Sequence, residues 1–354
     1  MKRSRHLKRA ALIAAAACGT VLALALAGCG GQAPQGSGSS AASGESAGGT
    51  SQPTEKITFA LDWTPNTNHT GLYVAAAKGY FAEQGLDVEV VQPPDGAAEP
   101  LVASGKAQFG VSFQDTLAPA LVGDDAMPIT AVAAIIQHNT SGIISRAGEG
   151  MDRPRGLEGH KYATWEMPVE QATIAQVMKD DGGDFAKVEL YPESVTDEVS
   201  ALQSKQVDAI WVFRGWGGVA CDVAGLDTDY FSFADIDPVF DYYTPVVIGN
   251  DEYLEQHPDV AKKFLAALKK GYEFAIDDPD AAADILMEQV PELAGSEDLI
   301  RASQRYLADQ YRADAAAWGV IDSGRWSAFY QWLLDNQLID AALDPTSGFT
   351  NEYL

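Results

Sequence analysis

The 354-residue sequence is poor in basic residues, and this shortage excludes some classes of binding partner. Lys and Arg number 24 against 50 Asp and Glu, so the formal net charge is −26 at pH 7. Phosphate contacts need clustered Lys and Arg, so we expect no nucleic-acid partner. Electrostatic docking on anionic lipid is disfavoured for the same reason. The acidity itself is typical of a solubility feature.

Cysteine is also scarce, with three residues in the chain. Cys18 lies in a segment that we expect to be removed, and Cys29 is expected to carry lipid, which leaves Cys221 without a disulfide partner. A lone cysteine of this kind is more often a small buried residue than a nucleophile.

The sequence contains no His-Glu-x-x-His motif and no phosphate-binding loop, so the enzymes that use these motifs are not indicated.

Long apolar runs are confined to the N-terminus. Basic residues within 2–9 precede an apolar stretch at 10–27, which predicts an export signal over residues 1–28. A short transmembrane anchor is the alternative. The ending Leu26-Ala27-Gly28-Cys29 resembles a bacterial lipobox, whose cysteine is acylated after cleavage. We therefore expect lipid anchoring through Cys29 at the extracytoplasmic face of the cell membrane.

Residues 29–54 predict a flexible tether. They are rich in Gly, Ser, Ala, Gln and Pro, with Glu45 as the only charge, so they cannot build a core. After the tether, no segment has the uninterrupted apolar length of about 20 residues that a spanning helix requires. The remaining residues, roughly 300, are enough for two domains of ordinary size.

Two blocks of alternating strand and helix patterns follow the tether. The first predicts strands at 57–61, 88–91, 109–113 and 129–137, and helices at 72–84, 97–103 and 116–122. The second predicts strands at 160–164, 188–191, 207–211 and 230–233, and helices at 169–179 and 198–205. Such alternation is typical of a mostly parallel α/β sheet. Beyond residue 244 the pattern is helical, at 251–256, 260–275, 280–290, 297–310 and 325–337.

We therefore predict an α/β fold with two lobes, a ligand cleft and a C-terminal helical tail. Lobe 1 is expected at 55–144 and lobe 2 at 145–243. Residues 244–354 are expected to return to lobe 1 and to form the tail helices. The chain would cross between the lobes near residues 142–146 and again near 243–249. Clefts between domains are favoured sites for small ligands.

The segment 61–71 is the strongest candidate for a binding site. An apolar run ends at Asp62, Trp63 follows, and an apolar helical pattern begins at Gly71. This order places a ring and a polar cluster between a strand end and a helix N-terminus, where open α/β sheets bind ligands. The alternative is an ordinary capped turn. We predict ligand contacts by Trp63, Asn66, Asn68, His69 and Thr70, with His69 either a pH-sensitive donor or a neutral structural donor.

Further candidates follow the ends of other predicted strands or lie at the second crossing: Gln114, Asp115, Trp165, Glu166, Trp211 and Tyr243. Asp115 could instead cap the next helix. Trp165 could oppose Trp63 across the ligand or pack in the core, and Trp211 has the same alternative because strand tryptophans are usually packed. Tyr243 could both support a hinge and line the cleft.

Six segments carry a family resemblance: 62–73, 77–81, 85–88, 104–110, 241–245 and 318–326. Through them the sequence from about residue 56 onward resembles bacterial solute-binding proteins for thiamine pyrimidine precursors, in a superfamily that also contains yeast-type pyrimidine synthases. The resemblance implies a periplasmic-binding-protein fold of type II and delivery of the ligand to an ABC transporter permease. In such binders a planar heterocycle stacks between aromatic rings, and Trp63 matches one stacking position.

The sequence departs from the binder pattern at 210–216. The family motif Tyr-Trp-x-x-Glu, whose acid pairs with the aminopyrimidine edge, here has Ile210 and Arg214 at its outer positions. A guanidinium only donates hydrogen bonds, so Arg214 would suit an oxygen of the ligand. The alternative is an ion pair across the cleft with Glu166 or Asp115. Glu166 could also replace the missing acid of the motif.

Two other functions remain as alternatives. A pyrimidine synthase of the yeast type carries a cysteine-rich run aligned with 237–243, and here that stretch has no cysteine, so soft iron ligands are missing. A binder of sulfonate, nitrate or a flavin-like ring is the second alternative, because the motif at 79–81 is shared with nitrate- and sulfonate-type binders. Several aromatic side chains favour a heteroaromatic ligand. We expect a binding protein without catalytic activity, metal or cofactor.

Overall fold

The computed structural model describes residues 54–93, 97–339 and 342–354. The predicted export signal, Cys29 and all but the last residue of the predicted tether lie outside the described residues. In the part of the chain that is described, no helix is both long enough and apolar enough to cross a membrane.

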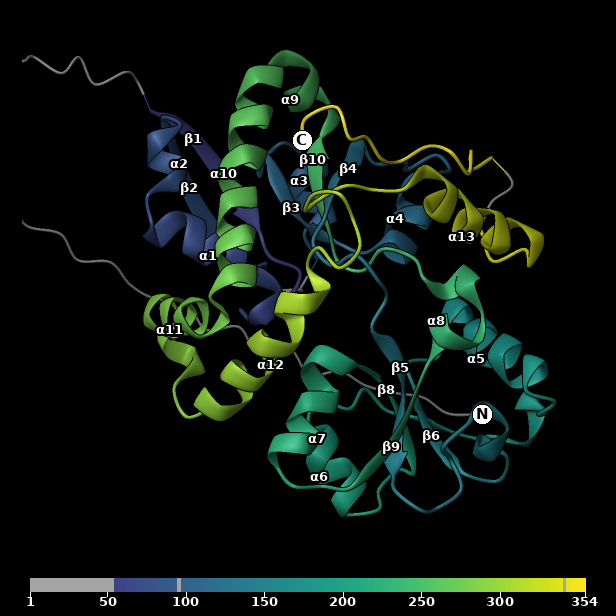
Figure 1. The fold of residues 1–354 in the computed structure, drawn as a ribbon. Coiled ribbons are helices and arrows are strands. Elements are labelled where there is room, and N and C mark those ends of the chain that lie inside the picture. The colour runs from purple at the N-terminus through teal and green to yellow at the C-terminus, as the bar shows by residue number, and fades with distance from the viewer. Residues whose placement is uncertain (1–53, 94–96, 340–341) are drawn as a thin grey trace, which may run out of the picture. The chain divides into compact units, whose positions relative to one another are not determined.

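The first five-stranded sheet defines lobe 1 (Figure 1). Its strands are β1 (Glu55–Ala60), β2 (Leu86–Val91), β3 (Phe109–Ser112), β4 (Ile129–Ala134) and β10 (Val246–Asn250). The order is β2-β1-β3-β10-β4; β1 is parallel to β2 and β3, whereas β10 is antiparallel to β3 and β4. Strands buried on both faces are nearly continuous apolar runs, as β4 is.

The second five-stranded sheet defines lobe 2. Its strands are β5 (Ser141–Arg146), β6 (Lys161–Thr164), β7 (Glu189–Pro192), β8 (Ala209–Phe213) and β9 (Thr228–Ser232). The order is β7-β6-β8-β5-β9; β6 is parallel to β7 and β8, whereas β5 is antiparallel to β8 and β9. Each sheet therefore has one antiparallel strand, β10 or β5, that directly follows a crossing between the lobes.

These two strands correct the expected positions of the crossings. Residues 142–146 form most of the fully buried strand β5, and residues 246–249 belong to β10. The sequence pattern of β5 is weak because it contains Gly142 and Arg146. A Cβ at Gly142 would lie 2.2 Å from the carbonyl oxygen of Phe231, so this strand pair needs glycine there. Arg146 is tolerated because it pairs with Asp208 at 2.6 Å.

Short helices join the strands of both lobes. Lobe 1 has η1 (Thr67–His69), α1 (Thr70–Ala77), α2 (Tyr80–Glu83), α3 (Glu99–Ala103) and α4 (Gln114–Ala120). Lobe 2 has η2 (Pro154–Leu157), α5 (Pro168–Asp180), η3 (Phe185–Lys187), α6 (Glu198–Gln203), the π-helix η4 (Arg214–Gly218), α7 (Val219–Val223), α8 (Phe233–Ile236) and η5 (Pro238–Phe240). The single helix predicted at 72–84 is divided at Gly79, whose φ of 75° ends α1.

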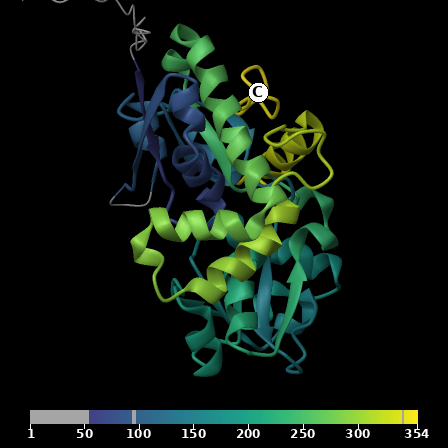
Figure 2. The same cartoon turned by 60° about the vertical axis from the view of Figure 1, so that its left-hand side comes forward.

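The helical tail packs on lobe 1 and also contacts lobe 2. It comprises α9 (Asp251–Gln256), α10 (Pro258–Asp277), α11 (Pro279–Gln289), η6 (Pro291–Leu293), α12 (Glu297–Gln310) and α13 (Ser323–Asp335). The apolar face of α10 lies against α1. In Figures 1 and 2, α12 lies where the two lobes meet, and it contacts η1 of lobe 1 as well as η4 and α7 of lobe 2.

Candidate ligand-binding cleft

A cavity of about 360 Å³ lies between the lobes, beyond the carboxyl ends of β1 and β8. We call it the first chamber. Its volume falls within the range of about 300–1,000 Å³ that is usual for small-molecule sites. The lining residues come from both lobes, the crossings and α12: Asp62, Trp63, Asn66, Asn68, Phe113, Ile136, Thr140, Trp165, Val195, Glu198, Trp211, Val212, Phe213, Gly215, Trp216, Gly217, Thr244, Pro245 and Leu307.

The acid of the lobe 1 wall is Asp62, two residues beyond β1. Its Oδ1 accepts a hydrogen bond from Nε2 of His69 at 2.7 Å. The Nδ1 of His69 accepts the backbone N–H of Asn66 at 3.2 Å, so Nε2 carries the ring proton and the imidazole is neutral. His69 thus fixes the orientation of Asp62, while Oδ2 of Asp62 has no hydrogen-bond partner among the described residues.

Two further side chains of this wall face the same space. Trp63 is 46% exposed, an unusual condition for a tryptophan in a folded lobe. Asn68 lines the chamber, and its side-chain amide has no hydrogen-bond partner in the described part of the chain. Asn66 is less available, because its side chain accepts from the N–H of Asn68 at 2.8 Å and donates to the carbonyl of Thr64 at 3.0 Å. Trp63 and Asn68 are therefore free to meet a ligand.

The lobe 2 wall consists mainly of aromatic rings. Trp165 and Trp211 lie with ring centroids 5.5 Å apart and planes at 47°. Trp211 is buried, and its Nε1 has no hydrogen-bond partner among the described residues. Phe213, the last residue of β8, faces Phe113 of lobe 1 with centroids 6.4 Å apart and planes at 15°. These rings provide broad apolar surfaces on which a planar ligand could stack.

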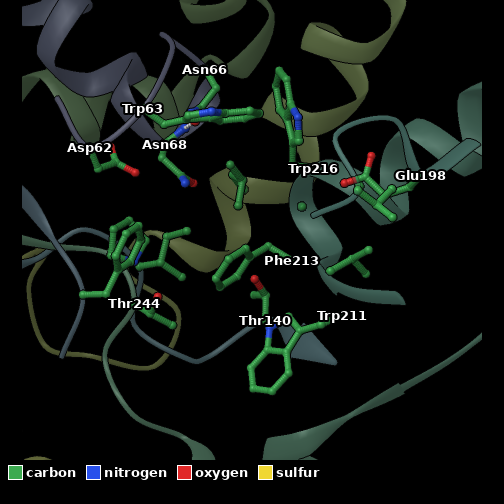
Figure 3. Close-up of a pocket in the computed structure, with 18 of the residues that line it drawn as sticks. Asp62, Trp63, Asn66, Asn68, Thr140, Glu198, Trp211, Phe213, Trp216 and Thr244 are labelled. Carbon is green, nitrogen blue, oxygen red and sulfur yellow. Dashed lines mark hydrogen bonds between the residues drawn. The ribbon is translucent and has the colours of Figure 1, made fainter. Parts of the chain in front are cut away.

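Glu198 is the acid of the lobe 2 wall and the first residue of α6. A Cβ on Gly217 of η4 would lie 2.9 Å from its Oε1, so this glycine lets the carboxylate lie against the backbone of η4. Burial raises the pKa of Glu198. No basic residue pairs with it in the described part of the chain. Figure 3 shows Glu198 on the opposite side of the chamber from Asp62 and Asn68.

The charge of the first chamber is wholly negative. Two carboxylates line it, Asp62 and Glu198, whereas no Lys, Arg or His is present among its described lining residues. Carboxylates accept hydrogen bonds and attract positive charge. The chamber is therefore suited to a ligand that presents N–H donors or a cation between aromatic surfaces.

A second chamber of about 380 Å³ adjoins the first. It shares Phe113, Trp165, Trp211, Phe213 and Thr244 with the first chamber. Its other lining residues are Asp115, Thr116, Ala118, Pro119, Met167, Val169, Glu170, Tyr242, Leu333, Leu338 and Ile339. Asp115, predicted from the sequence as a ligand contact, thus lines this chamber rather than the first. Burial of the Asp115 carboxyl raises its pKa to about 6.

Four predicted contacts lie behind the chambers instead of lining them. His69 contacts Asp62 and acts as the neutral structural donor, and Thr70 is fully buried in α1. Gln114 donates to the carbonyl of Trp326 at 2.8 Å and accepts the N–H of Tyr243 at 2.9 Å, so both ends of its amide are used inside lobe 1. Tyr243 is also buried, and its hydroxyl accepts the N–H of Asp322 at 2.7 Å.

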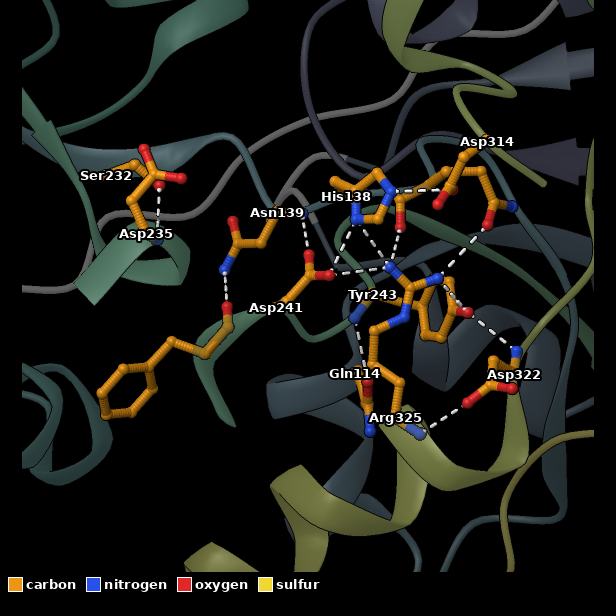
Figure 4. Close-up of polar contacts among 12 residues, drawn as sticks. Gln114, His138, Asn139, Ser232, Asp235, Asp241, Tyr243, Asp314, Asp322 and Arg325 are labelled. Carbon is orange, nitrogen blue, oxygen red and sulfur yellow. Dashed lines mark hydrogen bonds and ion pairs between the residues drawn. The ribbon is translucent and has the colours of Figure 1, made fainter. Parts of the chain in front are cut away.

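Tyr243 belongs to a polar network that ties the two crossings together (Figure 4). Arg325 of α13 donates to the carbonyl of Gln137 at 2.7 Å, to Asp241 at 2.9 Å and to the Tyr243 hydroxyl. His138 lies 2.7 Å from Asp241. Burial alone would lower the pKa of His138, but its hydrogen bonds to Asp241 and Asp314 outweigh this and raise it. The support of a hinge by Tyr243 stays a prediction.

Arg214 lies outside both chambers. Its guanidinium pairs with Asp222 at 2.6 Å, within lobe 2, and lies over the rings of Tyr230 and Tyr306. The partner is therefore neither Glu166 nor Asp115, the acids proposed from the sequence. Glu166 is exposed, lines neither chamber and has a φ of 60°. The acids that do line the first chamber, Asp62 and Glu198, are not in the predicted set.

The sequence contained signals for some of the missed residues. Asp62 ends the same apolar run that pointed to Trp63. Phe113 directly follows β3, and Phe213 is the last residue of β8, both on the cleft side. Glu198 has no such signal, because its place depends on Gly217 from a distant π-helix. Thr140 lies before β5, outside the range 142–146 that was expected for the first crossing, whereas Thr244 lies within the range 243–249 expected for the second crossing.

Comparison with solved structures identifies the fold as that of a periplasmic binding protein. The ligand-binding component of an ABC-type import system from Staphylococcus aureus, solved with zinc bound, superposes with a TM-score of 0.62 at 16% sequence identity, covering 85% of this chain and 98% of that one. Within the described residues of the present chain, no cluster of three or more His, Cys, Asp or Glu could hold a metal ion.

The chain belongs to the NMT1/THI5-like family, whose sequence model matches residues 66–282. A formylaminopyrimidine-binding protein from Halalkalibacterium halodurans is 28% identical over 283 residues, which is 79% of this chain and 84% of that protein. The 4-amino-5-hydroxymethyl-2-methylpyrimidine phosphate synthase THI11 of Saccharomyces cerevisiae is 27% identical over 320 residues, 85% of this chain and 88% of that protein. The relatives of this chain thus include both a binding protein and a synthase.

Proposed function

We propose that this protein is the solute-binding component of an ABC importer and that its ligand is an amino-substituted heteroaromatic of the pyrimidine-precursor type. The observation that carries the proposal is the pair of carboxylates, Asp62 and Glu198, in a chamber walled by aromatic rings. The fold supports the solute-binding role, and the formylaminopyrimidine-binding relative supports this class of ligand. The permease that receives the ligand would be part of the same importer.

The two walls would make different contacts with the ligand. Asp62, held by His69, has one free oxygen that can accept from an amino group of the ligand. The rings of Trp63 and of the lobe 2 wall would cover the faces of the heterocycle, and Asn68 could donate to or accept from its edge. In this scheme Asp62 supplies the acid that the family motif places at position 214.

Anionic solutes fit this chamber poorly. Sulfonate and nitrate need donors or cations, and the described lining residues include two carboxylates and no basic side chain. We also propose binding without catalysis. Of the cysteines, Cys221 is buried, with a pKa raised by burial to about 11, which is the opposite of an activated thiolate.

Titration calorimetry tests the proposal directly. We expect 4-amino-5-hydroxymethyl-2-methylpyrimidine to bind, and its analogue with a carbonyl in place of the amino group to bind at least tenfold more weakly, because Asp62 would then face an acceptor. Nitrate and ethanesulfonate should give no heat of binding. Binding of the two anions, or equal affinity for the amino and carbonyl compounds, would contradict the proposal.

We further propose that Cys29 carries a lipid that holds the protein on the extracytoplasmic face of the membrane. The proposal rests on the lipobox-like ending at residues 26–29. Replacing Cys29 by Ser should move the protein from the membrane fraction to the soluble fraction in cell fractionation. A Ser substitution at Cys18, which precedes the motif, serves as the control and should leave the protein in the membrane fraction.

A further inference from the structure

The second chamber offers more room than a single pyrimidine ring requires. Each chamber alone lies within the usual volume range of small-molecule sites, at about 360 and 380 Å³. The two share five lining residues, four of which are aromatic. A ligand that extends past Phe113 and Phe213 would therefore pass from one chamber into the other without leaving the aromatic surface.

The walls of the second chamber are mostly apolar and partly uncovered. Met167 is 56% exposed and Trp165 is 42% exposed, although both are large hydrophobic residues. Val169, Leu333, Leu338 and Ile339 extend the apolar lining. Exposed apolar side chains that converge on a concave site indicate a binding surface more often than an ordinary surface. An apolar group of a ligand would remove these side chains from water.

The second chamber contains two acids, which limit the charge that a ligand group bound there can carry. Glu170 is occupied, because it accepts hydrogen bonds from the Tyr162 hydroxyl at 2.6 Å and from backbone N–H groups of Trp165 and Met167. Asp115 forms no ion pair among the described residues and lies near the acid Glu99. A phosphate or carboxylate in this chamber would meet negative charge without a base. A neutral or cationic group is compatible.

We infer that the ligand has two parts: an amino-substituted heteroaromatic ring in the first chamber and an uncharged or cationic apolar group, such as a second ring, in the second chamber. This inference rests on the proposed function. It adds that the amino-heteroaromatic carries a substituent of roughly ring size and that the substituent is not phosphorylated. The residues around the second chamber would select for the substituent, and Asp62 and Glu198 for the first ring.

The test compares two probes that differ only in the substituent. One is 4-amino-5-hydroxymethyl-2-methylpyrimidine, and the other is its 5-benzyl counterpart. We expect the benzyl compound to bind at least tenfold more tightly to the purified protein in titration calorimetry, because it alone places an apolar ring in the second chamber. Thiamine, which joins the same pyrimidine to a cationic ring, should share the preference, whereas thiamine phosphate should lose it.

Variants of the second chamber test whether this chamber causes the preference for the benzyl probe. Thr116 is exposed and lines the second chamber, so Thr116→Trp should fill the chamber and reduce the benzyl preference to less than threefold. Met167→Asp places a charge among the apolar walls, at a position that is largely exposed. This variant should also reduce the benzyl preference to less than threefold. Thr54→Trp, the same change at an exposed position outside both chambers, should keep the tenfold preference. Thermal unfolding verifies that each variant is folded.

The outcomes separate the inference from the proposed function. Equal affinity for the hydroxymethyl and benzyl probes, or a preference unchanged in both Thr116→Trp and Met167→Asp, overturns the two-part ligand while pyrimidine binding itself still supports the proposed function. Absence of binding by every aminopyrimidine probe overturns both. Binding of the benzyl probe alone supports the two-part ligand most strongly.

Discussion

The two walls of the first chamber use different chemistry. On the lobe 1 wall the acid is held in place before any ligand arrives, because the neutral His69 donates to Asp62. On the lobe 2 wall the acid, Glu198, lies against the backbone of η4 without a basic partner, and the rest of the wall is rings. Under the proposed function, lobe 1 would select the ligand by hydrogen bonding, while lobe 2 would mainly supply aromatic surface and an acid whose pKa is raised by burial.

The largest expected effect is at Asp62. Asp62→Asn replaces a charged acceptor by an amide that also donates, and we expect aminopyrimidine affinity to fall about 100-fold, since hydrogen bonds to charged groups contribute about 1.5–3 kcal/mol each. Titration calorimetry measures the change. Asp309→Asn, at an exposed position of α12 away from the chamber, is the matched control. An Asp62→Asn protein that binds within threefold of wild type would refute the role given to lobe 1.

Trp63 is expected to have the next largest effect. Trp63→Ala removes a half-exposed ring without opening a core, so we expect the fold to persist and affinity to fall about 10- to 100-fold, because stacking of a base on an aromatic side chain contributes about 1–3 kcal/mol. Trp63→Phe keeps a ring and should recover part of the loss. Unchanged affinity in calorimetry, with unchanged thermal unfolding, would show that Trp63 does not stack on the ligand.

Glu198 should give a smaller effect that depends on pH. Burial raises the pKa of Glu198, so the side chain accepts hydrogen bonds fully only above that raised pKa and loses this capacity as the pH falls through it. Affinity for an aminopyrimidine should therefore rise with pH in the wild type. Glu198→Gln should bind about tenfold more weakly at pH 8, in line with one lost charged hydrogen bond, and should lack this contribution to the pH dependence.

A second variant tests Glu198 from η4, whose backbone lies against the carboxylate. Gly217→Ala places a methyl group against the Glu198 carboxylate and should weaken binding at pH 8 without removing the acid. A wild-type pH profile identical to that of Glu198→Gln would mean that the lobe 2 acid does not contact the ligand. The wall of lobe 2 would then contribute rings alone.

The smallest effect on binding is expected at Arg214. The structure places its guanidinium on Asp222 and between two tyrosine rings, outside both chambers. Arg214→Ala should change affinity less than threefold and lower the melting temperature modestly, since exposed ion pairs contribute only about 0–1 kcal/mol. A tenfold loss of affinity in Arg214→Ala, with a normal melting temperature, would return Arg214 to the binding site and weaken the contrast between the walls.

Local patterns in the sequence were sufficient for most of the fold. Apolar runs flanked by turn residues predicted β1, β3 and β6, and 3.6-residue periodicity predicted α10 and α12. The strands β5 and β10 were not predicted: the composition of β5 is a weak strand pattern, and the apolar residues Val246–Ile248 of β10 lie in the range that was assigned to a crossing. Gly142, for example, is explained only by the closeness of Phe231.

The site was predictable to the extent that its residues are neighbours in the chain. Trp63 and Asn68 follow one strand, and the structure places both in the first chamber. The direction of a side chain was not predictable where distant groups determine it. Arg214 turns away from the cleft because Asp222, Tyr230 and Tyr306 surround its guanidinium. Glu198 enters the chamber because Gly217 leaves room for its carboxylate.

The position of Ser303 on α12 has a consequence for how the lobes can move. Its buried hydroxyl lies 2.6 Å from the hydroxyl of Thr67 in η1 and also contacts the carbonyl of Gly215 in η4. Thr67 is one residue from Asn66 and Asn68, and Gly215 adjoins Trp216. Any separation of η1 from η4 must break one of these two hydrogen bonds, so the two walls of the first chamber cannot move apart without a change in the contacts of α12.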